Sequence, residues 1–377
     1  MLKTATGHPQ PLFVAVGSNP ARLYGLGAAE RAERLATEAQ LVSAPALVEG
    51  HSAILADLDF AWDPVWLKAM AARPGTVLTL DGRPVLAHVP TAFPADAILR
   101  AMRDKAVWTD NGLETLEAET ARLTHHPLRT RDRLFVLPLD AADTGPVERA
   151  AFDAADTGVT DALTLYVWRR PAFYLTRWAA NVGLMPNRVT AVGALLCLLA
   201  TGLFWQGHYW PGVVAGFAFM VLDTVDGKLA RCTGASSRWG HIFDHGINLI
   251  HPPLWWWAWA EGLSAYGTPI EPVLSAMLLA AIIGGDGAQR VIERIFARRF
   301  GMPIHVWQRV DSTFRLVTAR RNPNMIILIA GLIAGRPDVG LQTVALWTMI
   351  SLIFHAVRLA QANARRDRDR PVTSWLA

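Results

Sequence analysis

Residues 189–222 read VTAVGALLCLLATGLFWQGHYWPGVVAGFAFMVL, a run of 34 residues that contains no Asp, Glu, Lys or Arg. The run is long enough for two spans of about 17 residues each across a hydrocarbon core about 30 Å thick. The residues GHYWP at 207–211 supply a turn and the aromatic side chains that favour a membrane interface. This stretch therefore predicts a pair of membrane-spanning helices joined by a short loop.

Further apolar stretches follow this pair. A third span is predicted over Trp239–Ala260, a fourth around Pro272–Gly285, a short fifth over Asn322–Gly335 and a sixth over Val339–Val357. Most Lys and Arg residues fall on one side of these six spans, and the opposite loops hold only Glu261, Glu271, Arg336 and Asp338. The positive-inside rule then places both termini in the cytoplasm and the chain in the inner (cytoplasmic) membrane.

A seventh apolar element precedes the spans. Residues Tyr166–Val182 interleave Trp168, Phe173 and Trp178 with arginines, which is typical of an amphipathic helix that lies in the membrane interface. A plain linker helix is the alternative interpretation.

The charge of the chain changes sign near residue 160. Residues 1–160 hold 15 Lys and Arg against 20 Asp and Glu, whereas residues 161–377 hold 21 against 12, so that the net charges are −5 and +9. The second part also holds 12 of the 15 tryptophans. We therefore expect a cytoplasmic domain over residues 1–160 and a membrane domain over residues 161–377. In a membrane chain, basic loops indicate anionic lipid headgroups, so we expect membrane lipids and no nucleic acid as partners.

The first 160 residues alternate strand and helix patterns, which predicts a soluble α/β domain. Asp81-Gly82 marks a hairpin between two apolar runs. The predicted strands are Leu12–Val16, Pro45–Val48, Ser52–Leu58, Thr76–Leu80, Pro84–Val89 and Arg133–Leu137, and the predicted helices are Ala28–Gln40, Pro64–Ala72 and Ala95–Arg103.

The residues most suited to chemistry lie between the second and third spans. Asp223 and Asp226 are three residues apart at the end of the second span, and Asp244 and Asn248 are four apart at the start of the third. Carboxylates at membrane helix ends are functional candidates, and hard oxygen ligands suit Mg²⁺ or Mn²⁺. Two such ions could clamp a pyrophosphate for displacement at phosphorus. Gly227 and Ala230 are small enough for a nucleotide to approach the backbone, and Arg231 is placed to meet a phosphate.

This stretch resembles the signature of the CDP-alcohol phosphotransferase (CDP-alcohol phosphatidyltransferase) family, D-x2-D-G-x2-A-R followed after about eight residues by G-x3-D-x3-D. Seven of its eight fixed positions match, namely Asp223, Asp226, Gly227, Ala230, Arg231, Gly240 and Asp244. Pro186-Asn187-Arg188-Val189-Thr190 is similar to the P-N-x-V-T element of the family. The resemblance covers roughly residues 165–360.

The resemblance implies an enzyme of phospholipid synthesis. Its six transmembrane helices, usually in a homodimer, would transfer a phosphoalcohol group from a CDP-linked alcohol to an acceptor hydroxyl and release CMP. It implies that two divalent cations are held by Asp223, Asp226, Asp244 and residue 248. It also implies that Gly227, Ala230 and Arg231 line the CDP pocket, with Asn187 and Gly240 beside them.

Asn248 departs from the family pattern, which has an aspartate that also acts as general base. An amide can offer one oxygen to a metal but cannot take a proton. Three interpretations follow: the chain is inactivated, the acceptor needs no base, or a histidine substitutes. His241 and His251 share the helical face of Asp244 and Asn248, and neutral histidine is a suitable base.

A second basic set lies beyond the fourth span. Positive-inside charge explains most of it, but Arg290, Arg294 and Arg321 are candidates to line a pocket for an anionic acceptor or donor headgroup.

The first domain resembles a degraded nucleotidyltransferase of the kind that is fused to some members of the family. Residues 16–23 (VGSNPARL) stand where a phosphate loop is expected, and Asp57-Leu58-Asp59 resembles a metal-binding carboxylate pair. The loop lacks a run of glycines and has no following lysine, so we expect a folded but catalytically silent domain.

Two substrate assignments stay open. Either CDP-diacylglycerol donates to a polar alcohol or alcohol phosphate, or a small CDP-alcohol such as CDP-inositol donates to a lipid hydroxyl. The alternative function is a catalytically inactive membrane scaffold or sensor that binds a CDP-lipid, because Asn248 replaces the usual aspartate. A transporter is disfavoured, since no inverted repeat of broken helices is present.

Overall fold

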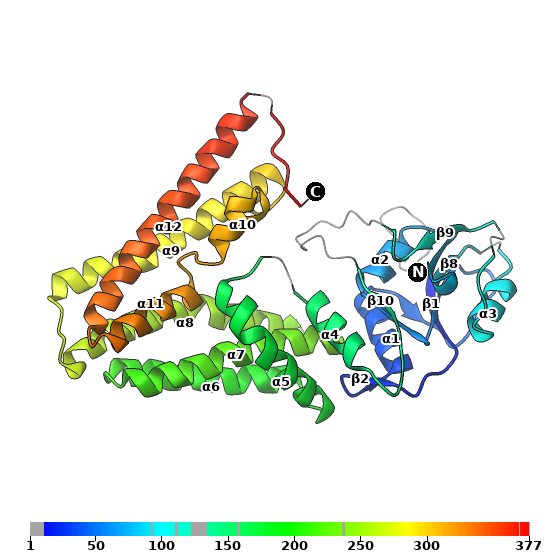
Figure 1. Ribbon diagram of the computed structural model, residues 1–377, viewed down its shortest axis with the longest axis horizontal. Coiled ribbons are helices and arrows are strands. Elements are labelled where there is room, and N and C mark those ends of the chain that lie inside the picture. The colour runs from blue at the N-terminus through cyan, green and yellow to red at the C-terminus, as the bar shows by residue number, and fades with distance from the viewer. Residues whose placement is uncertain are drawn as a thin grey trace.

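The computed structural model describes residues 11–91, 93–109, 112–121, 134–156, 159–235, 238–368 and 370–376. The side chains of Arg238, Trp239, His241, Asp244 and His245 lie outside the described part. An α/β region, drawn blue to cyan in Figure 1, precedes a helical region, drawn green to red. Both parts of the predicted architecture are confirmed at this level.

A six-stranded sheet forms the centre of the α/β region, in the order β4-β1-β5-β8-β7-β9. Strand β1 pairs in parallel with β4 and β5, while β8 is antiparallel to both β5 and β7, and β9 runs parallel to β7. Two small pairings, β10 with β6 and β2 with β3, complete the region. The strands are β1 Leu12–Val16, β2 Arg22–Leu23, β3 Leu26–Gly27, β4 Val42–Ser43, β5 Ala53–Asp57, β6 Phe60–Trp62, β7 Thr76–Leu80, β8 Arg83–Val89, β9 Glu114–Glu117 and β10 Val136–Pro138.

Both faces of the sheet are buried because successive strand residues point to opposite sides. Phe13 and Ile54 pack into one core with helices α1 (Ala28–Glu38) and α2 (Val65–Ala71). Their neighbours Val14 and Leu55 pack into a second core with α3 (Asp96–Arg103). The sheet therefore forms the middle layer of an α/β sandwich.

One predicted strand is wrong. Pro45–Val48 is irregular, and the edge strand is instead β4, where Val42 and Ser43 pair with Leu12 and Phe13. A proline has no backbone N–H to give to a ladder, which explains why pairing stops before Pro45. The strand predicted over Arg133–Leu137 is shifted to β10, and Arg133 lies outside the described residues. The other predicted strands and helices of this region are confirmed to within two residues.

Long helices dominate the second region (Figure 1). The helices predicted from the apolar stretches are all present, and several extend beyond the predicted spans into charged sequence. They are α4 Gly145–Ala154, a π-helical turn η1 Leu163–Trp168, α5 Arg169–Asn181, α6 Pro186–Trp205, α7 Tyr209–Thr233, α8 Arg238–Tyr266, α9 Pro272–Phe300, a 3₁₀ turn η2 Ile304–Val306, α10 Arg309–Arg315, α11 Arg321–Ile333 and α12 Pro337–Arg366.

Within the described residues, three helices are long and apolar enough to cross a membrane, namely α6, α9 and α12. Helix α11 is apolar but has only 13 residues. Helix α7 ends in the charged residues of the motif, and α8 contains Pro252, Pro253 and a run of tryptophans. The chain is thus an integral membrane protein with at least these apolar helices. An aromatic core that includes Phe204, Tyr209, Trp255 and Trp259 packs α6, α7 and α8 together.

The α/β region is joined to the helical region through α4. The Tyr24 hydroxyl donates to the Glu148 carbonyl over 2.6 Å, and the Glu148 carboxylate pairs with Arg177 of α5. The ring of Tyr24 shares one hydrophobic cluster with Phe173 of α5 and Val225 of α7. Helix α4 therefore positions the α/β region against the helix that carries the aspartate motif.

Candidate active site

Helix α7 presents the two aspartates of the motif one turn apart near its end. Asp226 is buried with 4% of its surface exposed, and Asp223 is partly exposed. The helix ends at Gly234, whose φ of 62° is the left-handed cap conformation that favours glycine. This cap ends α7 shortly before α8 begins, and α8 carries the second half of the motif.

Helix α8 brings Asn248 onto Asp223, as the sequence predicts. The Asn248 Nδ2 donates to Asp223 Oδ1 over 2.9 Å. The two halves of the motif therefore face each other across α7 and α8. Asp244 and His241, which the sequence places on the same face, have side chains outside the described part.

Arg321 of α11 completes a three-residue cluster. Its Nη2 lies 2.8 Å from Asp223 Oδ2, and its Nη1 donates to Asn248 Oδ1 over 3.0 Å. The guanidinium carbon is 5.4 Å from the centroid of the Phe219 ring. Among the side chains that the structure describes, this cluster holds one positive and one negative charge, and both oxygens of Asp223 accept hydrogen bonds.

His251 lies beside this cluster. It is buried, and its Nδ1 is 2.7 Å from the Ile247 carbonyl oxygen. Since that nitrogen is placed to donate to the carbonyl, the Nε2 is left with the lone pair, and it lies 3.4 Å from Arg321 Nη1. The rings of Phe219 and Trp255 pack edge-on against the imidazole and fix its plane.

A cavity of about 280 Å³ opens next to Asn248 and His251. Of the three arginines that the sequence proposes for an anion pocket, Arg290 and Arg321 line this cavity, and exposed Arg294 is not among the lining residues. The sequence analysis gave no role to Arg320, which lines the cavity and pairs with Asp286 and Glu293 of α9. The only signal for Arg320 in the sequence is its place beside Arg321 at the start of α11, and both arginines line the cavity.

The residues predicted to meet the nucleotide lie on the exposed side of the motif. The side chain of Arg231 lies over Gly227, where an added Cβ would be 3.2 Å from Arg231 Nη2. Ala230 and Gly240 are half-buried, and Asn187 is exposed at the start of α6. Gly227 thus leaves room for the arginine to lie flat against α7.

Lys228 is a motif residue to which sequence reasoning gave no role. Its ammonium donates to the Phe152 carbonyl over 2.6 Å, pairs with Asp156 and lies 4.2 Å from the centroid of the Phe152 ring. It stands five residues after Asp223, on another face of α7. Lys228 therefore ties the motif helix to α4.

The carboxylate pair predicted in the α/β region is neutralised by the chain itself. Arg83 lies 3.7 Å from Asp57 and 3.5 Å from Asp59, and Lys105 lies 2.7 Å from Asp59. Burial raises the pKa of Asp57 to about 6. In the segment that follows β1, Arg22 of β2 donates to the Gly25 carbonyl. Neither element resembles an open phosphate or metal site.

Comparison with known protein families matches the part of the chain that contains the aspartate motif. Residues 183–320 match the model of the CDP-alcohol phosphatidyltransferase family. These residues form a CDP-alcohol phosphatidyltransferase domain. They include the whole motif from Asp223 to Asn248 and end one residue before Arg321.

Relatives of this CDP-alcohol phosphatidyltransferase domain include phosphatidylinositol phosphate synthases and cholinephosphotransferases. The chain is 26% identical over 208 residues to a phosphatidylinositol phosphate synthase of Streptomyces avermitilis, covering 51% of this chain and 80% of that protein. It is 29% identical over 126 residues to cholinephosphotransferase 1 of Xenopus laevis, covering 30% of each chain. The chain thus spans less than a third of that second relative.

Solved structures are matched more distantly. Phosphatidylinositol phosphate synthase of Mycobacterium tuberculosis with CDP-DAG bound is 20% identical, with a TM-score of 0.39 over 50% of this chain and 94% of that one. The same protein in complex with manganese and citrate is 19% identical, with a TM-score of 0.39 over 50% and 88%.

The function predicted from the motif is confirmed at the level of the family. The chain is a membrane transferase of phospholipid synthesis that moves a phosphoalcohol group from a CDP-linked alcohol to a hydroxyl and releases CMP.

Proposed function

We propose that the donor is CDP-diacylglycerol and that the acceptor is a polar alcohol that itself carries a phosphate. The observation that carries this proposal is the arginine-lined cavity beside Asn248, which holds Arg290, Arg315, Arg320 and Arg321 against three carboxylates. A net positive cavity suits an anionic acceptor, and guanidinium groups bind phosphate with two parallel hydrogen bonds. A lipid hydroxyl would need no such set of arginines.

The donor set fits divalent cations. Asp223, Asp226, Asp244 and Asn248 would hold them, since carboxylate and amide oxygens are the ligands that Mg²⁺ and Mn²⁺ prefer. When bound, these cations neutralise charge on the pyrophosphate and make phosphorus a better electrophile. Because Asn248 carries no charge, the set offers one carboxylate fewer than the family pattern.

The other motif residues orient the substrates. Arg231, with Gly227, Ala230, Gly240 and Asn187 around it, would bind the CDP group on the exposed side of α7. Arg321 would exchange its contact with Asp223 for the phosphate of the acceptor. Its Nη1 already lies between Asn248 and His251, so the acceptor hydroxyl would be held close to both.

His251 is the proton acceptor that we favour. Its Nε2 faces the cluster with a lone pair, whereas the Asn248 amide cannot accept a proton at neutral pH. His241 shares the helical face and is the second candidate, with its side chain outside the described part. The transferred proton would thus stay on α8.

The remaining architecture is part of the same proposal. Residues 161–377 would form six spans in a homodimer in the inner membrane, with both termini cytoplasmic, as the loop charges favour. Residues 1–160 would form a nucleotidyltransferase-like domain without catalytic activity, because Arg83 and Lys105 form ion pairs with Asp57 and Asp59.

A second candidate is an inactive scaffold or sensor that binds a CDP-lipid. It is favoured by the closed cluster in which Asn248 and Arg321 satisfy both oxygens of Asp223. Cation binding would then need to displace a guanidinium. The two candidates differ in whether CMP is released.

CMP release by the purified chain in detergent with Mn²⁺ tests the proposal. We expect release from CDP-diacylglycerol with inositol phosphate or glycerol phosphate as acceptor, and none from CDP-inositol with diacylglycerol. Asp223→Asn should lower the rate by about 100-fold or more, because losing even a residue that only supports a metal ligand costs about 10–100-fold. Asp143→Asn, an exposed carboxylate of the α/β region, is the matched control. Cation-dependent CDP-lipid binding without CMP release, in both the native chain and Asn248→Asp, would establish the scaffold instead.

A further inference from the structure

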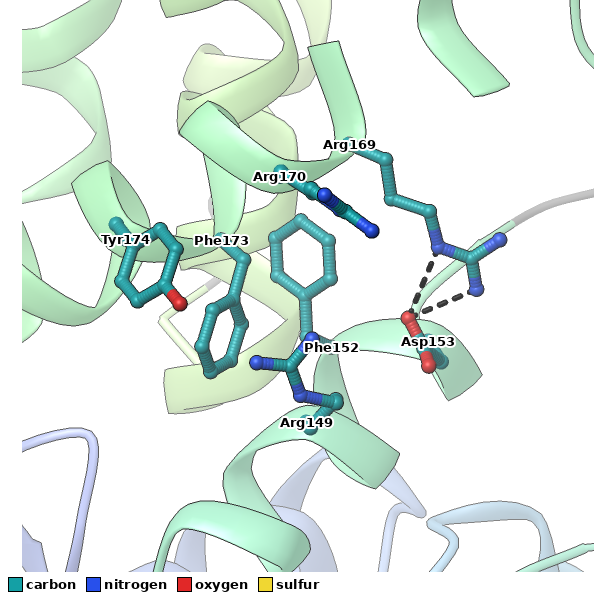
Figure 2. A pocket seen from close by; sticks show the side chains of 7 residues that line it. All are labelled: Arg149, Phe152, Asp153, Arg169, Arg170, Phe173 and Tyr174. Atoms are coloured by element: carbon teal, nitrogen blue, oxygen red, sulfur yellow. Dashed lines mark hydrogen bonds and ion pairs between the residues drawn. The ribbon is translucent and has the colours of Figure 1, made fainter. Parts of the chain in front are cut away.

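A second cavity, of about 370 Å³, lies between α4 and α5, and its lining residues are distinct from those beside Asn248. Three arginines and the rings of Phe152, Phe173 and Tyr174 line it (Figure 2). Arg149 rises from α4 and Arg170 descends from α5, on opposite sides of the Phe152 ring in this view.

Two of the three arginines have no carboxylate partner. Arg169 pairs with Asp153 at 2.8 Å and with Asp156 at 3.8 Å. Among the described residues, neither Arg149 nor Arg170 forms an ion pair. Arg149 is held instead over the Phe173 ring, 4.6 Å from its centroid, which fixes its direction without neutralising it. The cavity therefore has two unneutralised guanidinium groups.

The position of the cavity indicates a membrane surface. Tyr174 and Trp178 of α5 are 60% and 58% exposed, and Tyr166 of η1 is 71% exposed. Such amphipathic aromatic side chains favour the headgroup level of a bilayer. Helix α6, which is apolar enough to span a membrane, begins only five residues after α5 ends. A phosphate in this cavity would thus lie near lipid headgroups.

We infer that this cavity binds the phosphate of an anionic membrane lipid through Arg149 and Arg170, and that it holds the α/β region against the membrane. Two planar guanidinium groups suit a phosphate, and the aromatic rings suit the glycerol backbone beneath it. The inference uses no residue of the candidate active site and does not rest on the proposed substrates.

Lipid binding by the full chain tests this inference. The chain would be delipidated in detergent and its thermal unfolding followed on addition of phosphatidylglycerol, phosphatidylcholine or inorganic phosphate. We expect phosphatidylglycerol to raise the midpoint by several degrees, and the other two to leave it within one degree. A variant with Arg149→Gln and Arg170→Gln should lose the rise, while Arg149→Lys with Arg170→Lys should retain part of it.

The matched control removes the same charge elsewhere. Arg365→Gln with Arg366→Gln neutralises two exposed arginines at the end of α12 and should keep the full rise. An undiminished rise in the Arg149/Arg170 double Gln variant would overturn the inference. An equal rise with inorganic phosphate would assign the cavity to a soluble anion, and an equal rise with phosphatidylcholine would show non-selective lipid contact, so either would overturn it too. If the Gln variant does not fold, the charge-retaining Lys variant decides: a smaller rise than in the native chain supports the inference, because lysine cannot bind phosphate with two parallel hydrogen bonds, and an undiminished rise overturns it.

Discussion

At the scale of single residues, Asp223 decides how the site is arranged. One of its oxygens accepts from the Asn248 amide and the other from Arg321, so a carboxylate of the motif is fully hydrogen-bonded by residues of two other helices. A charge-neutral cluster is stable in a partly buried setting, because an unpaired carboxylate there would be costly. The same cluster raises the question of which group accepts the proton in catalysis.

We predict that His251 and residue 248 substitute for each other as base. In the native chain, His251→Ala should lower CMP release by about 100-fold or more, the usual contribution of a general base. In an Asn248→Asp background the same change should cost less than about fivefold, because the new carboxylate can take the proton. Steady-state rates of the four chains form the test. A large loss in both backgrounds would assign a structural role to His251.

A second prediction concerns pH and the α/β region. Burial lowers the pKa of His88, whose Nδ1 lies 2.7 Å from the Met70 carbonyl oxygen. The folded chain keeps this imidazole neutral, whereas the unfolded chain takes up a proton below a pH of about 6.5. The unfolded state then binds more protons, so stability falls as the pH drops below that value.

Hydrogen exchange of peptides from β8 measures this fall. Between pH 7.5 and 5.5, protection corrected for intrinsic exchange should decrease in the native chain. His88→Gln, which keeps a donor for the Met70 carbonyl, should make the decrease shallower. An identical decrease in both chains would assign the pH effect to other groups. His51, an exposed histidine, provides the matched control as His51→Gln.

The pattern of the sequence predicts the residues of the site better than it predicts their partners. Helical spacing is enough to place Asn248 against Asp223, since the two residues lie equally far from the short connection between α7 and α8. Arg321 lies 98 residues after Asp223 in the sequence. An arginine is expected to bind an anion, but the sequence does not tell which anion it binds. The role of Lys228 is not predicted because its partners, Phe152 of α4 and Asp156 just after it, belong to a segment that pattern alone does not bring near α7.

At the scale of elements, close packing of helix backbones sets the membrane region. An added Cβ at Gly262 of α8 would lie 1.9 Å from the Phe204 carbonyl oxygen of α6. The backbone of α6 cannot move aside as the end of a flexible side chain can, so only glycine fits at position 262, where α6 and α8 cross. Apolar periodicity predicts α6 and α8, but it does not reveal how closely they approach.

We predict that Gly262→Ala separates α6 from α8 and lowers the free energy of unfolding by about 3 kcal/mol, the upper end for overpacking. Gly284→Ala in α9 is the matched control, because an added Cβ there meets nothing within 4 Å. Alanine also favours a helix over glycine by about 1 kcal/mol, so the control should be neutral or more stable. The midpoints of thermal unfolding of the two variants in detergent provide the test. Equal midpoints would contradict the close approach of α6 and α8 at Gly262.

The sequence does not predict short polar strands that form only because a neighbouring strand offers them an edge. Strand β9, with the sequence ETLE, carries no strand pattern of its own and forms because Thr76–Thr79 of β7 offer it an edge. The long helices are easier to predict, because each apolar stretch has more residues than a single strand contains. Their extension to Phe300 and Arg366 was not predicted, because charged residues continue a helix without an apolar signal.

At the scale of the whole molecule, the loop charges predict the direction in which each apolar helix crosses the membrane. Motif residues, the α/β region and the arginines at the start of α11 all belong to ends that the positive-inside rule places in the cytoplasm. The same rule assigns the loop between α8 and α9 to the opposite side. This arrangement allows a direct test, because both native cysteines are buried and should give little background labelling.

We predict that a membrane-impermeant maleimide added to intact spheroplasts labels Glu271→Cys but not Arg365→Cys. Both positions are exposed on the chain, one at the start of α9 and the other near the end of α12, so only the membrane would separate their reactivity. Lysis before labelling should make Arg365→Cys reactive and leave Glu271→Cys unchanged. Reaction of both variants in intact cells would mean that α9 and α12 do not cross in the predicted direction, and the motif could not then face a cytoplasmic pool of CDP-linked donor.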